Sequence, residues 1–180
     1  YDNNTAITET LEAYALTLTN NDDDANNDVT LSVGGNLTVG AGGVTLNAVS
    51  GAGSTGSLGA DATLTMTGTT ISSTGGFTLN EISGGKATLI FNDTTDVTDQ
   101  AVTGAINAAT AGDGYIEVLN DAGVVTFNSK IGNTKRLASI HVSGGASTKF
   151  VSTVNATSLD NDGTIEFNVA GNGSVNMAVD

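Results

Sequence analysis

The sequence of 180 residues contains no cysteine, no proline and no tryptophan, and only five Phe and three Tyr. Without cysteine, disulfides, thiolate metal sites and thiol catalysis are excluded. The absence of proline removes a residue that commonly blocks sheet edges, so the edges of any sheet must be covered by other means. The scarcity of aromatic side chains argues against a sugar-cleaving cleft and favours close stacking of β layers over bulky helical packing.

Basic residues are also scarce, with 5 Lys and Arg against 19 Asp and Glu, which gives a formal net charge of −14. All the bases follow residue 85. Such a chain repels nucleic-acid phosphate and anionic lipid, so we expect neither as a partner. No run approaches the ~20 apolar residues that span a bilayer, so we expect no membrane insertion. Because Tyr1 is not an initiator Met and no signal peptide is present, the sequence indicates a processed chain or an excised fragment.

A short unit occurs twice. Gly42–Gly51 and Gly75–Gly84 both contain Gly-Gly, then an apolar residue, Thr-Leu-Asn, and finally Ser-Gly. Shorter echoes end at Asn128 and Asn168. Each unit is typical of a strand with alternating apolar residues that ends at Asn. Similar units along one chain indicate stacked or paired β modules.

The same alternation, with many short Gly-rich turns, predicts strands along most of the chain. They are expected at 13–19, 29–33, 36–39, 43–49, 62–67, 69–72, 76–82, 86–92, 114–119, 123–128, 137–142, 147–152, 155–159, 163–168 and 173–178. The turns at 120–123 and 160–163 are typical of hairpins or corners. The sequence therefore predicts one all-β domain, or a fragment of a larger surface protein, folded as a β-solenoid or a β-sandwich of many short strands.

Three segments fit this pattern less clearly. Residues 5–12 have helical spacing and stay undecided, while 101–111 are expected to form a short helix or helical turn. The acidic loop 20–28 joins two expected strands, which could form a long hairpin. Residues 1–28 could therefore be an N-terminal strand or arm followed by an acidic loop.

A calcium site is the most specific chemical hypothesis that the sequence supports, because carboxylates crowded into turns are suitable ligands for a hard cation. The candidate ligands are Asp22, Asp23, Asp24, Asp28, Asp93, Asp96 and Asp99, with Asp160 and Asp162 as further candidates. Neither an EF-hand spacing nor a calcium-binding nonapeptide is present. A solvated acidic loop is the alternative at each place.

Two other features have competing interpretations. His141, the only histidine, lies between Ile140 and Val142 in an alternating segment, which favours a surface strand position over catalysis. The Asn residues that end the repeated units could stack as a ladder along one corner, or each could cap its own turn.

Part of the chain resembles a known family. Residues Gly112–Val118, Gly123–Asn133 and Leu137–Val142 are similar to passenger regions of rickettsial-type outer-membrane autotransporters, and the likeness continues over Phe150–Leu159. It covers roughly 112–168. In that family such stretches are rungs of an extended β-solenoid displayed on the cell surface for adhesion. The resemblance therefore implies an extracellular, surface-displayed protein.

Together these observations predict a non-enzymatic, extracellular structural protein of a bacterial cell-surface assembly, such as an autotransporter passenger, an S-layer or a filament. Its expected partners are copies of itself, joined by β-strand pairing, or a ligand on a host or cell surface. The alternative hypothesis is a calcium-dependent adhesin or carbohydrate-binding module, with Ca²⁺ as its only cofactor.

Overall fold

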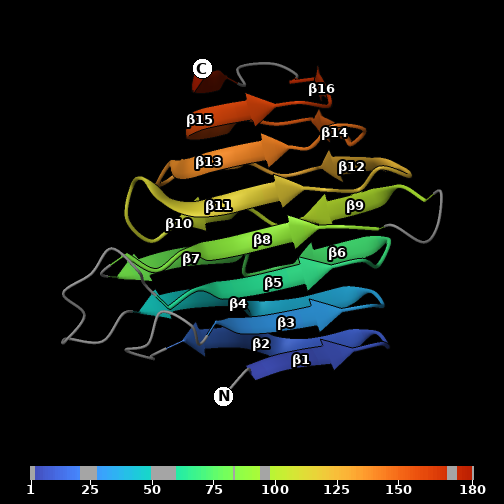
Figure 1. Ribbon diagram of the computed structural model, residues 1–180, viewed down its shortest axis with the longest axis vertical. Helices are drawn as coiled ribbons and strands as arrows, with labels where there is room; N and C mark the ends of the chain where they lie inside the picture. Colours follow the sequence, from blue (N-terminus) through green and yellow to red (C-terminus); the bar gives the residue numbers. More distant parts are fainter. Residues whose placement is uncertain are drawn as a thin grey trace.

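The computed structural model describes residues 3–20, 28–49, 60–82, 84–93, 98–169 and 174–179. Within these ranges the protein is all-β, with 17 strands and no helix, and every strand pair is parallel (Figure 1). The all-β prediction is confirmed. Residues 3–20, which the sequence assigns to a strand or arm, supply the first two strands of the stack.

The strands lie in two sheets. The eight-stranded sheet contains, in spatial order, β1 (Asn3–Ile7), β3 (Val29–Val33), β5 (Ala62–Met66), β8 (Ala87–Phe91), β11 (Asp113–Val118), β13 (Leu137–Val142), β15 (Val154–Asn161) and β17 (Val175–Val179). The nine-stranded sheet contains β2 (Leu11–Asn20), β4 (Leu37–Val49), β6 (Thr70–Ser73), β7 (Phe77–Ile82), β9 (Gln100–Thr103), β10 (Ile106–Ala108), β12 (Val124–Phe127), β14 (Ser147–Phe150) and β16 (Thr164–Phe167).

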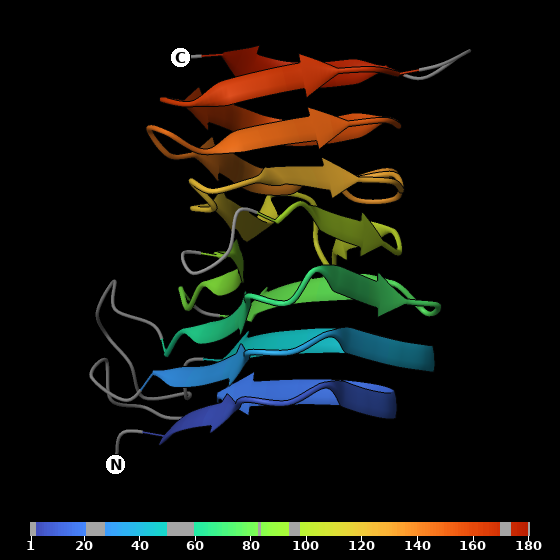
Figure 2. The same cartoon turned by 90° about the vertical axis from the view of Figure 1, so that its right-hand side faces the viewer.

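The chain passes repeatedly from one sheet to the other, and we call each such circuit a rung. A rung adds one strand to the eight-stranded sheet and then one or two strands to the nine-stranded sheet. Figures 1 and 2 show the rungs stacked from the N-terminal to the C-terminal end. The nine-stranded sheet has two rows, because residues 37–39 of β4 pair with β6 whereas residues 44–49 pair with β7. Each rung therefore turns at a first corner, where it enters the eight-stranded sheet, and at a second corner, where it leaves it.

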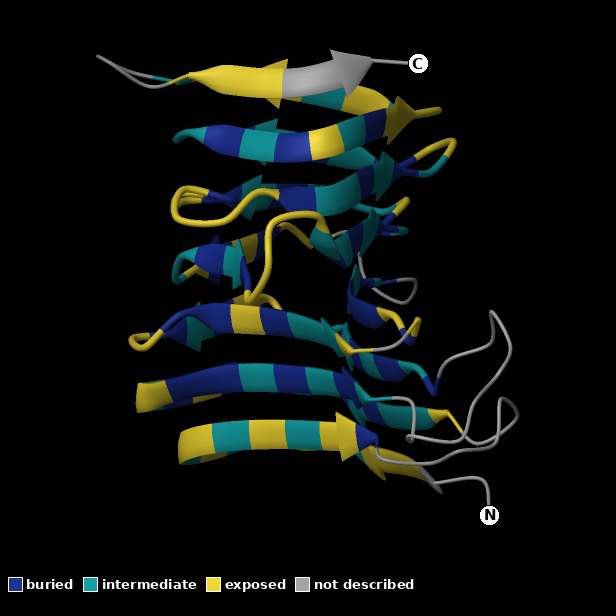
Figure 3. Cartoon of the chain, turned by 90° about the vertical axis from the view of Figure 1, so that its left-hand side faces the viewer, coloured by how far each residue is buried: buried dark blue, intermediate teal, exposed yellow. Residues whose placement is uncertain are grey.

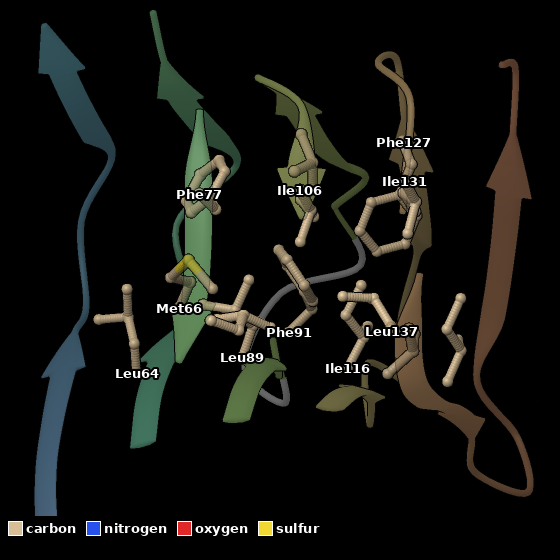
Figure 4. Close-up of a cluster of buried hydrophobic side chains, with 14 of the residues drawn as sticks. Leu64, Met66, Phe77, Leu89, Phe91, Ile106, Ile116, Phe127, Ile131 and Leu137 are labelled. Atoms are coloured by element: carbon tan, nitrogen blue, oxygen red, sulfur yellow. The ribbon is translucent and has the colours of Figure 1, made fainter. Parts of the chain in front are cut away.

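The core consists of like residues stacked from rung to rung. In the eight-stranded sheet one column runs through Leu31, Leu64, Leu89, Ile116, Ile140 and Leu159, which are direct neighbours in the register. All are buried, and Figure 4 shows Leu64, Leu89 and Ile116 among the other core side chains. Burying one such side chain stabilises the fold by about 1.5–3 kcal/mol. The column explains why the sequence alternates, because every second residue must point inward (Figure 3).

A second column is aromatic. Phe127, Phe150 and Phe167 are neighbours in β12, β14 and β16, and their rings stack with centroids 5.2 and 5.4 Å apart. Phe91 meets Phe127 edge to face at 5.0 Å. Four of the five Phe residues of the chain therefore form one continuous stack along the rungs.

The expected helix at 101–111 is wrong. Residues 100–103 form β9 and residues 106–108 form β10. Val102 and Ile106 have helical spacing, but both are buried in the core because the chain turns between them at Gly104, whose φ is +125°. A corner and a helical turn thus produce the same four-residue spacing of inward residues.

The expected hairpin across the acidic loop is also wrong. β2 pairs in parallel with β4, and β3 pairs in parallel with β1 and β5, so the strands on either side of the loop belong to different sheets. The strand expected at 13–19 is confirmed as part of β2. Residues 120–123 and 160–163 lie where β11 and β15 lead to β12 and β16, so these turns are corners from one sheet to the other and not hairpins.

Candidate functional site

Side chains at the corners accept hydrogen bonds from backbone N–H groups of the next rung. A corner interrupts the ladder, so nearby N–H groups need another acceptor. At the second corner, the Oδ1 atom of Asn36 accepts from the Thr70 N–H at 2.9 Å, and that of Asp99 accepts from Val124 at 2.9 Å. Ordinary turn residues of the sequence therefore stabilise the stacking of rungs.

Carboxylates perform the same role at the first corner. Asp28 Oδ1 accepts from the Asp61 N–H at 3.2 Å, and Asp61 Oδ1 accepts from the Lys86 N–H at 2.8 Å. Each bond joins the start of one strand of the eight-stranded sheet to the start of the next. These carboxylates thus act as hydrogen-bond acceptors for backbone N–H groups.

The calcium candidates are divided between separate places. Asp22, Asp23, Asp24 and Asp96 lie outside the described residues. Asp28 lies at the first corner, whereas Asp93 and Asp99 precede β9 at the second corner. Asp93 is buried, and its Oδ2 accepts from the Thr98 hydroxyl at 2.9 Å. Within the described ranges no three His, Asp or Glu residues come together in a way that could hold a metal. A calcium site stays a prediction.

Glu81 is a half-buried carboxylate that is not among the candidate residues predicted from the sequence. Its Oε1 accepts from the N–H groups of Ala87 at 3.1 Å and Gly114 at 3.0 Å. Burial raises the pKa of Glu81 above the ordinary value, the two backbone hydrogen bonds oppose this, and the nearby charges of Asp113 and Asp61 raise it further. The two copies of the repeated unit place Glu81 opposite the buried Ala48, so the repeat itself indicates an inward position for this carboxylate.

His141 lies on the outer face of β13, opposite Glu117 of β11 and Asp160 of β15. Its Nε2 is 3.7 Å from Oδ2 of Asp162, and its side chain is about one-third exposed. Asp160 and Asp162, the further calcium candidates, therefore lie beside this histidine. The arrangement is that of a surface strand residue with acidic neighbours.

Of the two alternatives for the repeated Asn residues, a ladder is present at the first two. Asn80 Nδ2 donates to Asn47 Oδ1 at 3.0 Å, and Asn47 Nδ2 donates to the Thr19 hydroxyl at 3.1 Å. The two copies of the repeated unit are thus neighbours in adjacent rungs, with Asn47 opposite Asn80. Asn128 and Asn168 follow β12 and β16 in the other row, so they do not extend this ladder.

A groove lies at the first corner of the C-terminal rungs, with a volume of about 530 Å³. Its polar lining consists of Thr134, Lys135, Arg136, Asn155, Thr157 and Asn176. These residues come from the segment before β13, from β15 and from β17, so the groove crosses successive rungs. Its volume is in the range of small-molecule sites. We call it the basic groove.

Comparison with protein-family models, curated proteins and solved structures finds no match. A function for the chain must therefore be inferred from its own geometry. In the part of the chain that the structure describes, no helix has the length and apolar character needed to cross a membrane.

The two sets of polar residues have different chemical capacities. Four corner carboxylates already accept hydrogen bonds from backbone N–H groups of neighbouring rungs, and this binding holds rungs together. They are Asp28, Asp61, Glu81 and Asp99. The basic groove contains two cationic side chains together with amides and hydroxyls, and it opens to solvent. The groove is therefore a candidate site for a small molecule.

Proposed function

We propose that the chain is a β-solenoid that serves as a non-catalytic structural element of a bacterial cell-surface assembly, such as an autotransporter passenger, an S-layer or a filament. The observation that carries the proposal is the unbroken parallel pairing of the eight-stranded sheet from β1 to β17. Each rung contacts mainly its neighbours, so the stack is a quasi-one-dimensional rod whose length grows with rung number. Such a rod is suited to displaying a surface at a distance.

Self-association is the second part of this proposal. β1 pairs only with β3, and β17 only with β15, so each strand leaves one edge unpaired within the described residues. All strands are parallel, so the edge of β17 in one copy is complementary to the edge of β1 in another. Head-to-tail pairing of this kind is heterologous and extends into a filament.

Apolar side chains at both ends support the same contact. At the C-terminal end, Phe167 is 42% exposed and Val175 is 40% exposed. At the N-terminal end, Leu11, Leu16 and Leu18 are only partly buried. Stacking of one copy on another would continue the core columns and remove these side chains from water.

Replacing Leu18 by Lys tests the association, because it places a charge where the core column would continue. Thr17→Lys is the matched control, since Thr17 is the exposed neighbour in the same strand. We expect filaments or large species from the unmodified chain and from Thr17→Lys, but not from Leu18→Lys, by negative-stain microscopy and sedimentation velocity. Circular dichroism verifies that each variant keeps its β content. Equal assembly by a folded Leu18→Lys variant would contradict end-to-end pairing.

The proposed location is the extracellular face of a bacterial cell, and the proposed partners are copies of the chain or a ligand on a host or cell surface. The Thr-, Asn- and Gly-rich composition and the resemblance over 112–168 support this location. Antibody labelling of intact cells that express the chain tests it. Labelling that requires cell lysis would contradict the proposed location.

A further inference from the structure

The basic groove carries positive charge, whereas the chain as a whole is strongly acidic. Its lining contains Lys135 and Arg136, two of only five bases in the chain, and none of its described lining residues is acidic. Along the same corner toward the N-terminal end, Asp28, Asp61 and Glu81 accept backbone hydrogen bonds. The first corner is therefore acidic in its early rungs and cationic at the groove.

The cations of the groove have no internal partner among the described residues. Lys149 pairs with Glu166 at 3.0 Å, and the ammonium of Lys86 lies 5.2 Å from the ring centroid of Tyr115. Neither Lys135 nor Arg136 forms an ion pair with any described residue, and both are exposed. Two adjacent unpaired cations form a local positive patch that attracts a small anion at short range, whereas the net charge of −14 opposes its approach from a distance.

The backbone that carries these cations is held in place. The N–H groups of Ala108 and Gly112 donate to the carbonyl oxygens of Lys135 at 3.3 Å and Arg136 at 3.0 Å, and Asn107 Oδ1 accepts from the Thr134 N–H at 3.0 Å. Fixing the loop before a ligand arrives lowers the entropy cost of binding.

The opposite wall offers neutral polar groups. Asn176 Nδ2 donates to Asn155 Oδ1 at 2.8 Å, and Asn155 Nδ2 donates to the Gly132 carbonyl at 3.2 Å. Each amide keeps further hydrogen-bonding capacity. The hydroxyls of Thr134 and Thr157 form no hydrogen bond with a described residue. These groups are suited to ligand hydroxyls.

We propose that the basic groove binds a small anion that also carries hydroxyl groups, namely a sugar bearing a carboxylate or a phosphate. Arg136 and Lys135 bind the anionic group, and the Asn and Thr side chains bind the hydroxyls. Guanidinium groups match the geometry of both carboxylate and phosphate. This inference goes beyond the proposed structural role, because a scaffold needs no such site.

The test is titration of the full chain with glucuronate, glucose 6-phosphate, glucose and inorganic phosphate, followed by NMR chemical shifts at low ionic strength. We expect glucuronate, glucose 6-phosphate or both to bind more tightly than glucose and inorganic phosphate, and the better ligand identifies the anionic group. Added salt should weaken this binding because the site is open to solvent.

Substitutions test whether binding depends on the basic residues of the groove or on any exposed basic residue. Arg136→Gln and Lys135→Gln should each raise the dissociation constant of the preferred sugar about tenfold. Lys130→Gln is the matched control, because Lys130 is exposed in the same segment but does not line the groove, and it should change the constant less than twofold. The proposal is overturned by no binding, by equal binding of glucose or inorganic phosphate, or by an equal loss in Lys130→Gln.

Discussion

At the scale of single residues, polar side chains at the corners replace the hydrogen bonds that the ladder lacks. A buried N–H without an acceptor costs about 1–3 kcal/mol, so each such side chain has a structural role without any ligand. Asn120 is the most enclosed example: it is fully buried, its Oδ1 accepts from the N–H groups of Ala122 and Gly123, and its Nδ2 donates to Gln100. Gln100 in turn donates to the carbonyl oxygens of Met66 and Gly68. This series of hydrogen bonds therefore joins three rungs.

Glu81 makes the stability of the folded protein depend on pH. Burial raises its pKa in the folded state above the ordinary 4.5, so the folded protein binds this proton more tightly than the unfolded chain does. Stability from this group is therefore present below pH 4.5 and is lost as the pH rises through the folded-state pKa. Glu81→Gln keeps the acceptor oxygen and lacks the charge, so we expect it to be more stable than the unmodified chain near pH ~8.

Urea unfolding at several pH values measures this difference. The advantage of Glu81→Gln should shrink as the pH falls toward about 4, because the native carboxyl then becomes neutral too. Glu12→Gln is the control, since Glu12 is exposed on β2 and should show little such change. A Glu81→Gln variant that is less stable than the unmodified chain at the alkaline end of the series would disprove this account.

At the scale of elements, glycines set the places where strands bend within a rung. In both copies of the repeated unit the second glycine has a positive φ, +72° at Gly43 and +80° at Gly76. The bend turns the chain from one row of the nine-stranded sheet to the other. A Cβ at residue 76 would lie 2.7 Å from the carbonyl oxygen of Ala105 in the next rung. Gly76 is thus required both by conformation and by close stacking.

The substitution Gly76→Ala tests these two requirements together, and Gly84→Ala separates them. Gly84 also has a positive φ, +98°, but nothing lies within 4 Å of an added Cβ. We expect Gly84→Ala to lose about 1–2 kcal/mol from conformation alone. Gly76→Ala should lose clearly more, because the Ala105 backbone must move. Chemical denaturation with urea measures both, and equal losses would show that the contact with Ala105 is unimportant.

The sequence predicted the strands well because alternation depends on neighbours along the chain. Residues 62–66 alternate Ala, Thr, Leu, Thr and Met, and the apolar members are buried. Pairing was harder to predict, because Asn, Asp and Gly form both hairpin turns and corners. The basic groove had no sequence signal: Arg136 and Asn155 become neighbours only because of the length of the intervening rung, which no local pattern determines.

At the scale of the whole molecule, repulsion among the negative charges destabilises the stack of rungs. A net charge of −14 is carried by a 17.9 kDa chain, and residues 1–85 contain no base to offset their acids. Asp28 and Asp61 precede the register neighbours Val29 and Ala62, so these two carboxylates lie in adjacent rungs at the ~4.8 Å spacing of strands, where like charges repel. Mobile cations screen this repulsion, with a Debye length of about 10 Å at 0.1 M salt.

Thermal unfolding should therefore shift to higher temperature as NaCl rises from about 10 mM to 500 mM. The triple variant Glu9→Gln, Glu12→Gln and Asp121→Asn removes three exposed charges and should show a smaller shift, with a higher melting temperature at low salt. CaCl₂ at matched ionic strength forms a second comparison, because a calcium site would raise the melting temperature beyond the NaCl effect. A melting temperature that is independent of NaCl would show that short-range packing outweighs the repulsion between rungs.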